Sequence, residues 1–257
     1  MRIIAIVNQK GGVAKSTSTL SISAGLANAG RRVLMVDLDP QSSLTYSLGI
    51  QAHDLELTIY NLLNKTAKHN DVIIAKNNYG IIPASLEHLA DADIEFATVP
   101  GREFLLKEAL EPLTDYDYIL LDCPPSLGLL TLNALTTAAE VFIPVHAEFL
   151  SIQGMAKLME TVNLVKKRLN KTLEVTGVFC TKFSNRKTLN REIYNSLKEH
   201  FGSKLFTSCI RDNVSIAEAS SFGKDIFDYK GDSAGAEDYK GLVDEILAME
   251  VSKNGKG

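Results

Sequence analysis

Residues 8–20, NQKGGVAKSTSTL, contain a glycine-bearing loop that follows an apolar strand-like segment and leads into a helical segment that begins near Lys15. This order of strand, loop and helix is the context of a phosphate-binding P-loop. Backbone N–H groups of such a loop form a nest for phosphate, Lys15 reaches the outer phosphates, and the Ser16 hydroxyl is placed to ligate Mg²⁺. The segment predicts a nucleotide site although Gln9 and Ala14 occupy both glycine positions of the pattern G-x-x-x-x-G-K-[ST].

Glycine is present at two other positions of this loop. Gly11 and Gly12 let the backbone approach phosphate closely, because neither residue carries a Cβ atom. Ala14 is the smallest substitute for the glycine that it replaces. If the backbone at this position needs a positive φ, the Cβ atom of Ala14 costs on the order of 1 kcal/mol.

The rest of the chain alternates apolar strand-length runs with helical patterns, which is typical of a parallel sheet covered by helices on both faces. Several of the runs are apolar almost throughout, as strands buried on both faces should be. Strands are expected at residues 3–7, 33–37, 81–83, 118–122, 141–145 and 175–180. Helices are expected at residues 15–29, 102–110, 129–138, 152–169, 189–200 and 236–249. The fold class predicted is α/β: a single-domain P-loop NTPase with a mostly parallel twisted sheet.

Length and composition fit one large domain. The chain has 257 residues, of which 45% are hydrophobic and 23% charged, the composition of an ordinary globular protein. One domain over residues 1–250 and a flexible tail over residues 251–257 are expected. No apolar run approaches the roughly 18 residues of a membrane span, and no secretory signal precedes the first strand. Three separated cysteines, with no C-x-x-C spacing, are expected to be small buried or half-buried side chains in a reducing cytoplasm.

Carboxylates follow two of the expected strands. VLMVDLDPQSS, residues 33–43, places Asp37 and Asp39 at the carboxyl edge of a buried strand, where open α/β sheets bind ligands. YDYILLDCPPSLG, residues 116–128, ends an apolar strand in Asp122, the usual position of a metal-holding carboxylate in P-loop enzymes. Alternatively, Asp37 and Asp39 only cap a helix that begins near Ser42.

The segment KGGVAKST resembles the deviant P-loop K-G-G-x-x-K-[ST] of the ParA/MinD family of ATPases, and Asp122-Cys-Pro-Pro resembles the second switch of that family. The resemblance implies ATP and Mg²⁺ as cofactors and an ATP-sandwiched homodimer. It implies that Lys10 reaches the nucleotide of the partner subunit, as an arginine finger does. It also implies that Asp39 orients the attacking water, that Ser16, Asp37 and Asp122 hold Mg²⁺, and that the nucleotide is bound by Lys10, Gly11, Gly12, Val13, Ala14, Lys15, Ser16 and Thr17. Thr181 and Lys182 are expected near the adenine; otherwise they belong to an ordinary loop.

Residues 210–246 resemble the end of ParA/Soj-type partitioning ATPases, with A-E-A-x-S-F-G-K and S-x-G-A-x-x-Y almost intact. Such proteins bind DNA non-specifically as ATP dimers, and a ParB-like centromere-binding protein stimulates hydrolysis and releases them. The resemblance therefore implies chromosome or plasmid partition by a slow, Mg²⁺-dependent ATPase in the cytoplasm, associated with the nucleoid.

The charge distribution fits such a partner. The net charge is −4, yet residues 157–230 hold 14 Lys and Arg against 8 Asp and Glu. Basic side chains in this stretch are expected to contact DNA phosphates without sequence preference. The family segment I-P-R-N reads Ile210-Arg211-Asp212-Asn213 here, so the basic residue is shifted by one position. The candidate DNA contacts are Arg186, Lys187, Arg191, Lys198, Arg211, Lys224 and Lys230.

Three other functions share parts of this pattern. A ParA-like ATPase that positions a non-DNA cargo on the nucleoid uses the same motifs, so the sequence leaves it open. A MinD-like membrane-cycling regulator ends in a basic amphipathic helix, whereas residues 238–250 are acidic, and no membrane partner is expected. A nitrogenase-type iron protein needs two cysteines per subunit for its cluster, and Cys123 has no evident mate.

Overall fold

The computed structural model describes residues 1–147 and 149–254, and these residues form a seven-stranded sheet of order β3-β4-β2-β5-β1-β6-β7. All pairings are parallel except that of β3 with β4, which is antiparallel. This topology confirms the predicted α/β fold class. The short edge strand β3 was not predicted. The strands are β1 (Arg2–Ile6), β2 (Val33–Asp37), β3 (Ile74–Lys76), β4 (Tyr79–Ile82), β5 (Tyr118–Asp122), β6 (Glu140–His146) and β7 (Glu174–Thr181).

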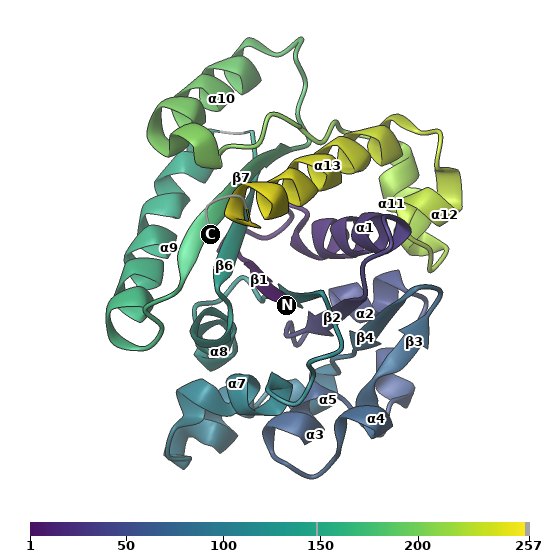
Figure 1. Ribbon diagram of the computed structural model, residues 1–257, viewed down its shortest axis with the longest axis vertical. Coiled ribbons are helices and arrows are strands. Elements are labelled where there is room, and N and C mark those ends of the chain that lie inside the picture. Colours follow the sequence, from purple (N-terminus) through teal and green to yellow (C-terminus); the bar gives the residue numbers. More distant parts are fainter. Residues whose placement is uncertain (148, 255–257) are drawn as a thin grey trace.

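Helices cover both faces of this sheet, as Figure 1 shows. Because successive side chains of a strand point to opposite faces, Ile4 and Ile6 pack in one apolar layer while Ala5 and Val7 pack in the other. The first layer is closed by α1 (Lys15–Asn28) and α13 (Ala234–Asn254), which lie side by side. The second is closed by α7 (Leu105–Leu110), α8 (Leu129–Thr137), α9 (Phe149–Arg168) and α10 (Thr188–Phe201).

Shorter helices fill the connections. They are α2 (Ser43–Ser47), α3 (Ile59–Leu63), α4 (His69–Val72), α5 (Leu86–Leu89), α6 (Ala92–Glu95), α11 (Val214–Ser221) and α12 (Ile226–Lys230), with 3-10 turns at Ala52–Asp54, Phe96–Thr98, Arg102–Phe104 and Gly202–Lys204. Helix α13 continues four residues into the tail that was predicted after residue 250, and residues 255–257 lie outside the described residues. Cys123 and Cys180 are buried and Cys209 is half-buried, which confirms the expected burial of the three side chains.

The sheet brings the predicted carboxylates together. Strands β1, β2 and β5 run parallel, and Asp37 at the end of β2 lies beside Asp122 at the end of β5. The phosphate loop follows β1 at the same edge. Ligands of open α/β sheets bind at this carboxyl edge, so the topology places the loop and both carboxylates around one crevice.

Candidate functional site

The loop between β1 and α1 has the left-handed backbone that phosphate loops require. Gly12 has φ +73° and Ala14 has φ +66°, and Ala14 is the residue immediately before the first turn of α1. The carbonyl of Ala14 accepts a hydrogen bond from Ser18 N at 2.9 Å, so the helix continues directly from this strained residue. The positive φ that was considered at position 14 is confirmed, and an alanine occupies it.

Two side chains outside the motif hold the loop in shape. Asn8 Nδ2 donates to Pro144 O at 2.8 Å, and Asn8 Oδ1 accepts from Lys10 N at 3.0 Å. Thr181 Oγ1 donates to Val13 O at 3.2 Å, which ties the end of β7 to the loop. The hydroxyl of Thr181 therefore helps to position the phosphate loop, and the expected place of Thr181 near the adenine stays a prediction. Asn8 was not identified from the sequence, because its partner on β6 is distant along the chain.

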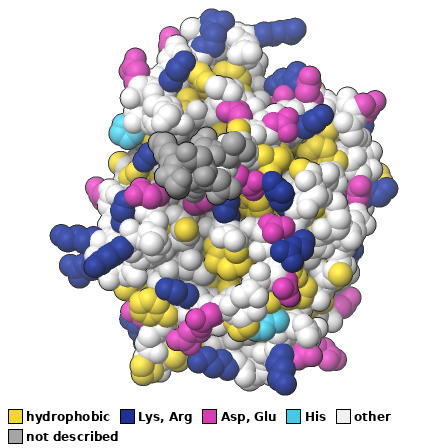
Figure 2. Space-filling view, viewed as in Figure 1, with side chains coloured by type: hydrophobic (Ala, Val, Ile, Leu, Met, Phe, Trp, Pro, Cys, Tyr) yellow, Lys and Arg dark blue, Asp and Glu magenta, His cyan; other side chains and the backbone are white. Residues whose placement is uncertain are grey.

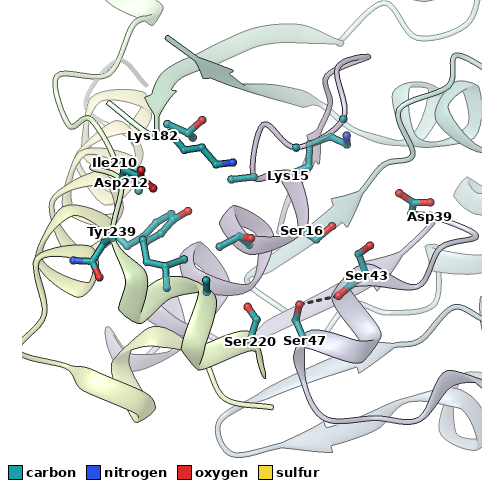
Figure 3. A pocket seen from close by; sticks show the side chains of 18 of the residues that line it. Lys15, Ser16, Asp39, Ser43, Ser47, Lys182, Ile210, Asp212, Ser220 and Tyr239 are labelled. Carbon is teal, nitrogen blue, oxygen red and sulfur yellow. Dashed lines mark hydrogen bonds between the residues drawn. The ribbon is translucent and has the colours of Figure 1, made fainter. Parts of the chain in front are cut away.

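The loop opens into a cleft of about 540 Å³. Lys15 is 7% exposed and Asp39 is 8% exposed, and both line this cleft. In Figure 3, Lys15 and Ser16 lie between Asp39 on one side and Lys182 and Tyr239 on the other. Of the predicted phosphate-loop and adenine residues, the cleft is lined by Gly11, Gly12, Ala14, Lys15, Ser16, Thr17, Thr181 and Lys182. Val13 is fully buried behind the loop, and Lys10 is not among the lining residues.

Asp122 is a buried carboxylate with one oxygen available to bind a cation. Its side chain is fully buried, and Oδ1 accepts from Thr19 Oγ1 at 3.2 Å. Oδ2 is buried and has no hydrogen-bond partner among the described residues. Burial and the neighbouring charge of Asp37 raise the pKa of this carboxyl well above its usual range, against the opposing effect of Ser16 and Lys15. A buried carboxylate with a vacant oxygen fits Mg²⁺ bound beside the Ser16 hydroxyl.

Asp37 makes a different set of contacts. Its Oδ2 accepts from Thr45 N at 2.9 Å and from Thr45 Oγ1 at 2.7 Å, and its Oδ1 accepts from Asp39 N at 3.1 Å. Burial raises the pKa of Asp37 to about 6, although these hydrogen bonds oppose the shift. Because both carboxylate oxygens of Asp37 accept hydrogen bonds from Asp39 and Thr45, Asp37 fixes the conformation of the loop that carries Asp39. Asp37 therefore caps the first turn of α2 through Thr45, as the alternative interpretation of the two aspartates expected. Asp39, in contrast, lines the cleft.

Protein groups alone do not complete a metal site in the described part of the chain. No group of three or more His, Cys, Asp or Glu side chains there could hold an ion. Mg²⁺ usually keeps several waters and is held by one or two carboxylates together with substrate phosphates. The donors present, Ser16 and Asp122, therefore fit a magnesium ion that enters with a nucleotide.

The wall of the cleft opposite Asp39 was not predicted from the sequence. It consists of Ile210, Asp212, Asn213 and Ile216, which precede or begin α11, and of Tyr239 from α13. Asn213 Oδ1 accepts from Ser215 N at 2.8 Å and so caps α11. The Tyr239 hydroxyl lies 3.0 Å from Ser18 Oγ of α1. An Asn before a helical segment signals a cap, but no local pattern places this wall beside the phosphate loop.

The predicted DNA contacts are exposed but do not form one patch. Four of them, Arg186, Lys187, Arg191 and Lys198, lie on α10 or just before it, and Lys224 and Lys230 lie at α12. These helices are well separated in Figure 1. A further group of basic side chains gathers at the left edge of Figure 2, on the side where α9 ends in Lys166, Lys167 and Arg168.

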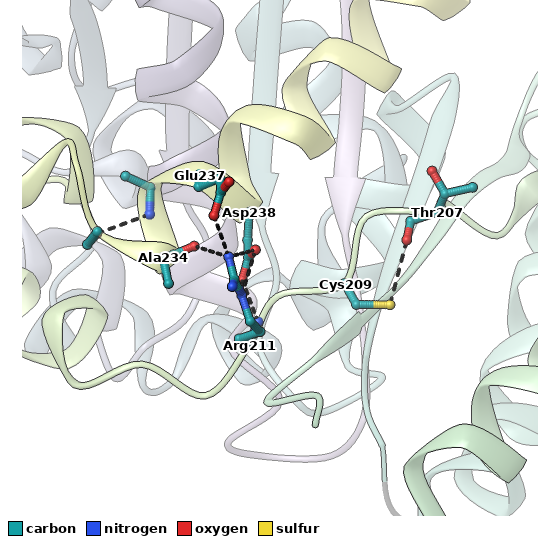
Figure 4. A network of polar contacts seen from close by, with 8 residues as sticks. Thr207, Cys209, Arg211, Ala234, Glu237 and Asp238 are labelled. Atoms are coloured by element: carbon teal, nitrogen blue, oxygen red, sulfur yellow. Dashed lines mark hydrogen bonds and ion pairs between the residues drawn. The ribbon is translucent and has the colours of Figure 1, made fainter. Parts of the chain in front are cut away.

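Arg211 differs from the other six candidates. Its guanidinium is paired with Asp238 and Glu237 of α13, at 2.6 and 2.7 Å, as Figure 4 shows. Its side chain is exposed, as those of the other six candidates are, but its Nε and Nη2 donors are directed at acceptors of α13. Among residues 1–147 and 149–254, no helix has the length and apolar character needed to cross a bilayer.

Comparisons with known proteins agree with this site. A family profile described as an AAA domain matches residues 1–175. The sporulation initiation inhibitor protein Soj of Bacillus subtilis is 44% identical over 96% of this chain and 98% of its own length, and the chromosome partitioning protein ParA of Caulobacter vibrioides is 37% identical over 100% and 97%.

Two solved structures share the fold and carry nucleotide. Cobyrinic acid a,c-diamide synthase from Mycobacterium smegmatis with bound ADP and magnesium is 33% identical, with a TM-score of 0.87 over 98% of this chain and 96% of that chain. The septum site-determining protein MinD from Pyrococcus horikoshii, complexed with Mg-ADP, is 28% identical, with a TM-score of 0.78 over 95% of each chain. The profile match and the near full-length similarity to Soj and ParA show that the chain belongs to the ParA/Soj-type ATPases of the ParA/MinD family.

Proposed function

We propose that this chain is an ATP-dependent DNA-partitioning protein that acts as an ATP-sandwiched homodimer. The observation that carries the proposal is a phosphate loop already held in its binding shape, with Lys15 and Asp39 on one cleft. The names of the relatives, Soj and ParA chromosome partitioning protein, support partition as the purpose of this ATPase. We propose that the single domain expected over residues 1–250 continues to the end of α13 at residue 254.

Hydrolysis needs charge neutralisation and a positioned water. Lys15 is buried at the base of the cleft, where its ammonium would hold the outer phosphates in a site of low water content. Ser16 and Asp122 would hold Mg²⁺, which supplies neutralisation of charge on the phosphate oxygens. Asp39 presents its carboxylate to the cleft from the loop that Asp37 shapes, where it orients the attacking water. Lys10, outside the lining of its own cleft, serves the nucleotide of the facing subunit.

DNA binding would follow from the dimer. The six exposed basic residues around α10 and α12 are proposed to contact phosphates, and two copies double the number of contacts. Basal turnover is proposed to be slow until a ParB-like partner or cargo adaptor completes the site. The protein would then be cytoplasmic and bound to the nucleoid while it holds ATP.

Retention of DNA in three nucleotide states tests this function. Double-stranded DNA of arbitrary sequence should be retained with ATP and Mg²⁺, and not with ADP or without nucleotide. Retention should fall steeply between low and high salt, because each phosphate contact releases counterions. Lys15→Ala is the matched control that removes nucleotide binding. Equal retention in all three nucleotide states would refute the ATP-dependent part of the proposal.

A further inference from the structure

Arg211 is a sequence-predicted DNA contact whose side chain the structure directs elsewhere. We propose that Arg211 is a positioning residue for the nucleotide cleft. Its side chain fastens residues 210–213, which form part of the cleft wall, to α13. This inference rests on the proposed nucleotide site and assigns to Arg211 a role within it.

The guanidinium of Arg211 donates hydrogen bonds to three residues of α13. Nε donates to both oxygens of Asp238 at 2.9 Å, and Nη2 donates to Asp238 Oδ1 at 2.6 Å, to Glu237 Oε2 at 2.7 Å and to Ala234 O at 3.2 Å. The backbone N–H of Arg211 also donates to Asp238 Oδ2 at 2.8 Å. The Asp238 side chain is 11% exposed, whereas the side chains of Arg211 and Glu237 are 47% and 78% exposed, so only the Asp238 end of the network is sheltered from water. Charge-assisted bonds of a bidentate fork fix geometry as well as energy.

The same face of α13 holds the chain that leads to Arg211. Glu245 lies two helical turns after Asp238 and accepts from Thr207 N at 2.9 Å and from Ser208 N at 2.7 Å. Residues seven apart lie on one face of a helix. Two acidic residues of α13 therefore bind three backbone N–H groups of the segment 207–211. These contacts give Asp238 and Glu245 a structural role in the acidic last helix.

Neighbouring residues of α13 contact both this wall and α1, the helix that follows the phosphate loop. Asp238 binds Arg211, and the next residue, Tyr239, lies 3.0 Å from Ser18 of α1 through its hydroxyl. Arg211 and Tyr239 both line the cleft. The contacts through α13 therefore help to set the distance between the wall and the phosphate loop. Loss of the Arg211–Asp238 pair would loosen the wall at Arg211, while Ile210 stays hydrogen-bonded to Cys180 O and Phe183 N.

The local charge does not favour a DNA phosphate at this position. Arg211 stands beside Asp212 in the chain and against Glu237 and Asp238 in space. A phosphate that approached this guanidinium would meet three carboxylates. The guanidinium of Arg191, in contrast, donates to Asn185 O and Thr188 Oγ1, which are neutral acceptors.

Arg211→Gln and Asp238→Asn test the proposal, with two controls. Lys240→Gln removes an exposed charge from α13, and Arg186→Gln removes a proposed DNA contact. Each variant is checked for folding by its thermal melting curve. Binding of a non-hydrolysable ATP analogue is measured by calorimetry without DNA, and DNA affinity is measured against salt at saturating analogue.

We expect Arg211→Gln and Asp238→Asn each to weaken nucleotide binding about tenfold and to raise KM while kcat stays near the wild-type value, because one hydrogen-bonded charge pair is lost. The double variant should bind no more weakly than either single variant, since both remove one pair. The slope of log affinity against log salt should not change. Arg186→Gln removes one contact from each subunit of the dimer, so it should lower the magnitude of that slope by about 1.8 and leave nucleotide binding intact.

The opposite pattern overturns the inference. If Arg211→Gln lowers the salt slope as Arg186→Gln does, and leaves nucleotide affinity unchanged, Arg211 is a DNA contact. If Asp238→Asn leaves nucleotide affinity unchanged, the pair does not position the wall. If the wild-type protein retains no DNA, the proposed function fails, while the calorimetric measurement still decides the role of Arg211.

Discussion

Replacing Ala14 by glycine should stabilise this protein, although glycine destabilises most helices. Ala14 has φ +66° and ψ +36° and directly precedes α1. For an L-amino acid this left-handed conformation brings the Cβ atom close to the following carbonyl oxygen and costs about 1–2 kcal/mol. Ala14→Gly removes that Cβ atom and releases the strain.

Two opposing effects reduce the gain. Glycine increases the conformational entropy of the unfolded chain, which costs about 0.4–1 kcal/mol. Loss of a half-buried methyl group costs about 0.4 kcal/mol, half the value of a fully buried one. The net expectation is an increase of about 0.5 kcal/mol in the free energy of unfolding, or a rise of about 1–2 °C in melting temperature for a chain of this size.

Urea unfolding of the nucleotide-free protein measures this change, with Ala24→Gly as the matched control. Ala24 lies inside α1 and is 1% exposed. The same substitution there should cost about 2 kcal/mol, roughly half from helix propensity and half from the buried methyl group. The free energy of unfolding should therefore rise in Ala14→Gly and fall in Ala24→Gly. A loss of stability in Ala14→Gly comparable to that of Ala24→Gly would refute the argument that position 14 is strained.

Three further outcomes follow from the site. Lys15→Ala should abolish ATP binding, and an unchanged affinity by calorimetry would contradict the phosphate-loop assignment. Asp39→Ala should bind ATP yet hydrolyse little of it, and full steady-state turnover in that variant would remove its proposed role. Burial raises the pKa of Asp37 to about 6, so between pH 4 and 6 the folded chain holds more protons than the unfolded chain, and this group lowers the free energy of unfolding as pH rises through that window. Urea unfolding without nucleotide or Mg²⁺ should show this slope, and Asp37→Asn should reduce it without abolishing it, because the raised pKa of Asp122 contributes a slope of the same sign. An equal slope in both proteins would contradict the role of Asp37.

The parallel core was predictable because its signals are local. β2 and β5 were predicted with the bounds that the structure shows, since each is an apolar run that ends in an aspartate. The antiparallel strand β3 was missed because it has three residues and follows no alternating pattern. The short helices between residues 52 and 98 were missed for a similar reason, because none is longer than five residues.

The site was predictable to the extent that its residues belong to one motif. Lys15, Ser16 and Asp39 line the cleft as their spacing indicated. The contacts of Thr181 and Arg211 were not predictable, because each depends on a partner far along the chain. Thr181 could be placed near the nucleotide, but only the three-dimensional fold shows that its hydroxyl binds the carbonyl of Val13.

The central claim is that two copies of this chain share each ATP. Lys10→Ala and Asp39→Ala should each hydrolyse little ATP alone, since one lacks the lysine given to its partner and the other lacks its own carboxylate. Mixed in equal amounts, they should recover about a quarter of the wild-type rate, because half of the dimers are mixed and each of those has one intact site. A mixture as inactive as its components would mean that Lys10 does not act across the dimer, and would contradict the account.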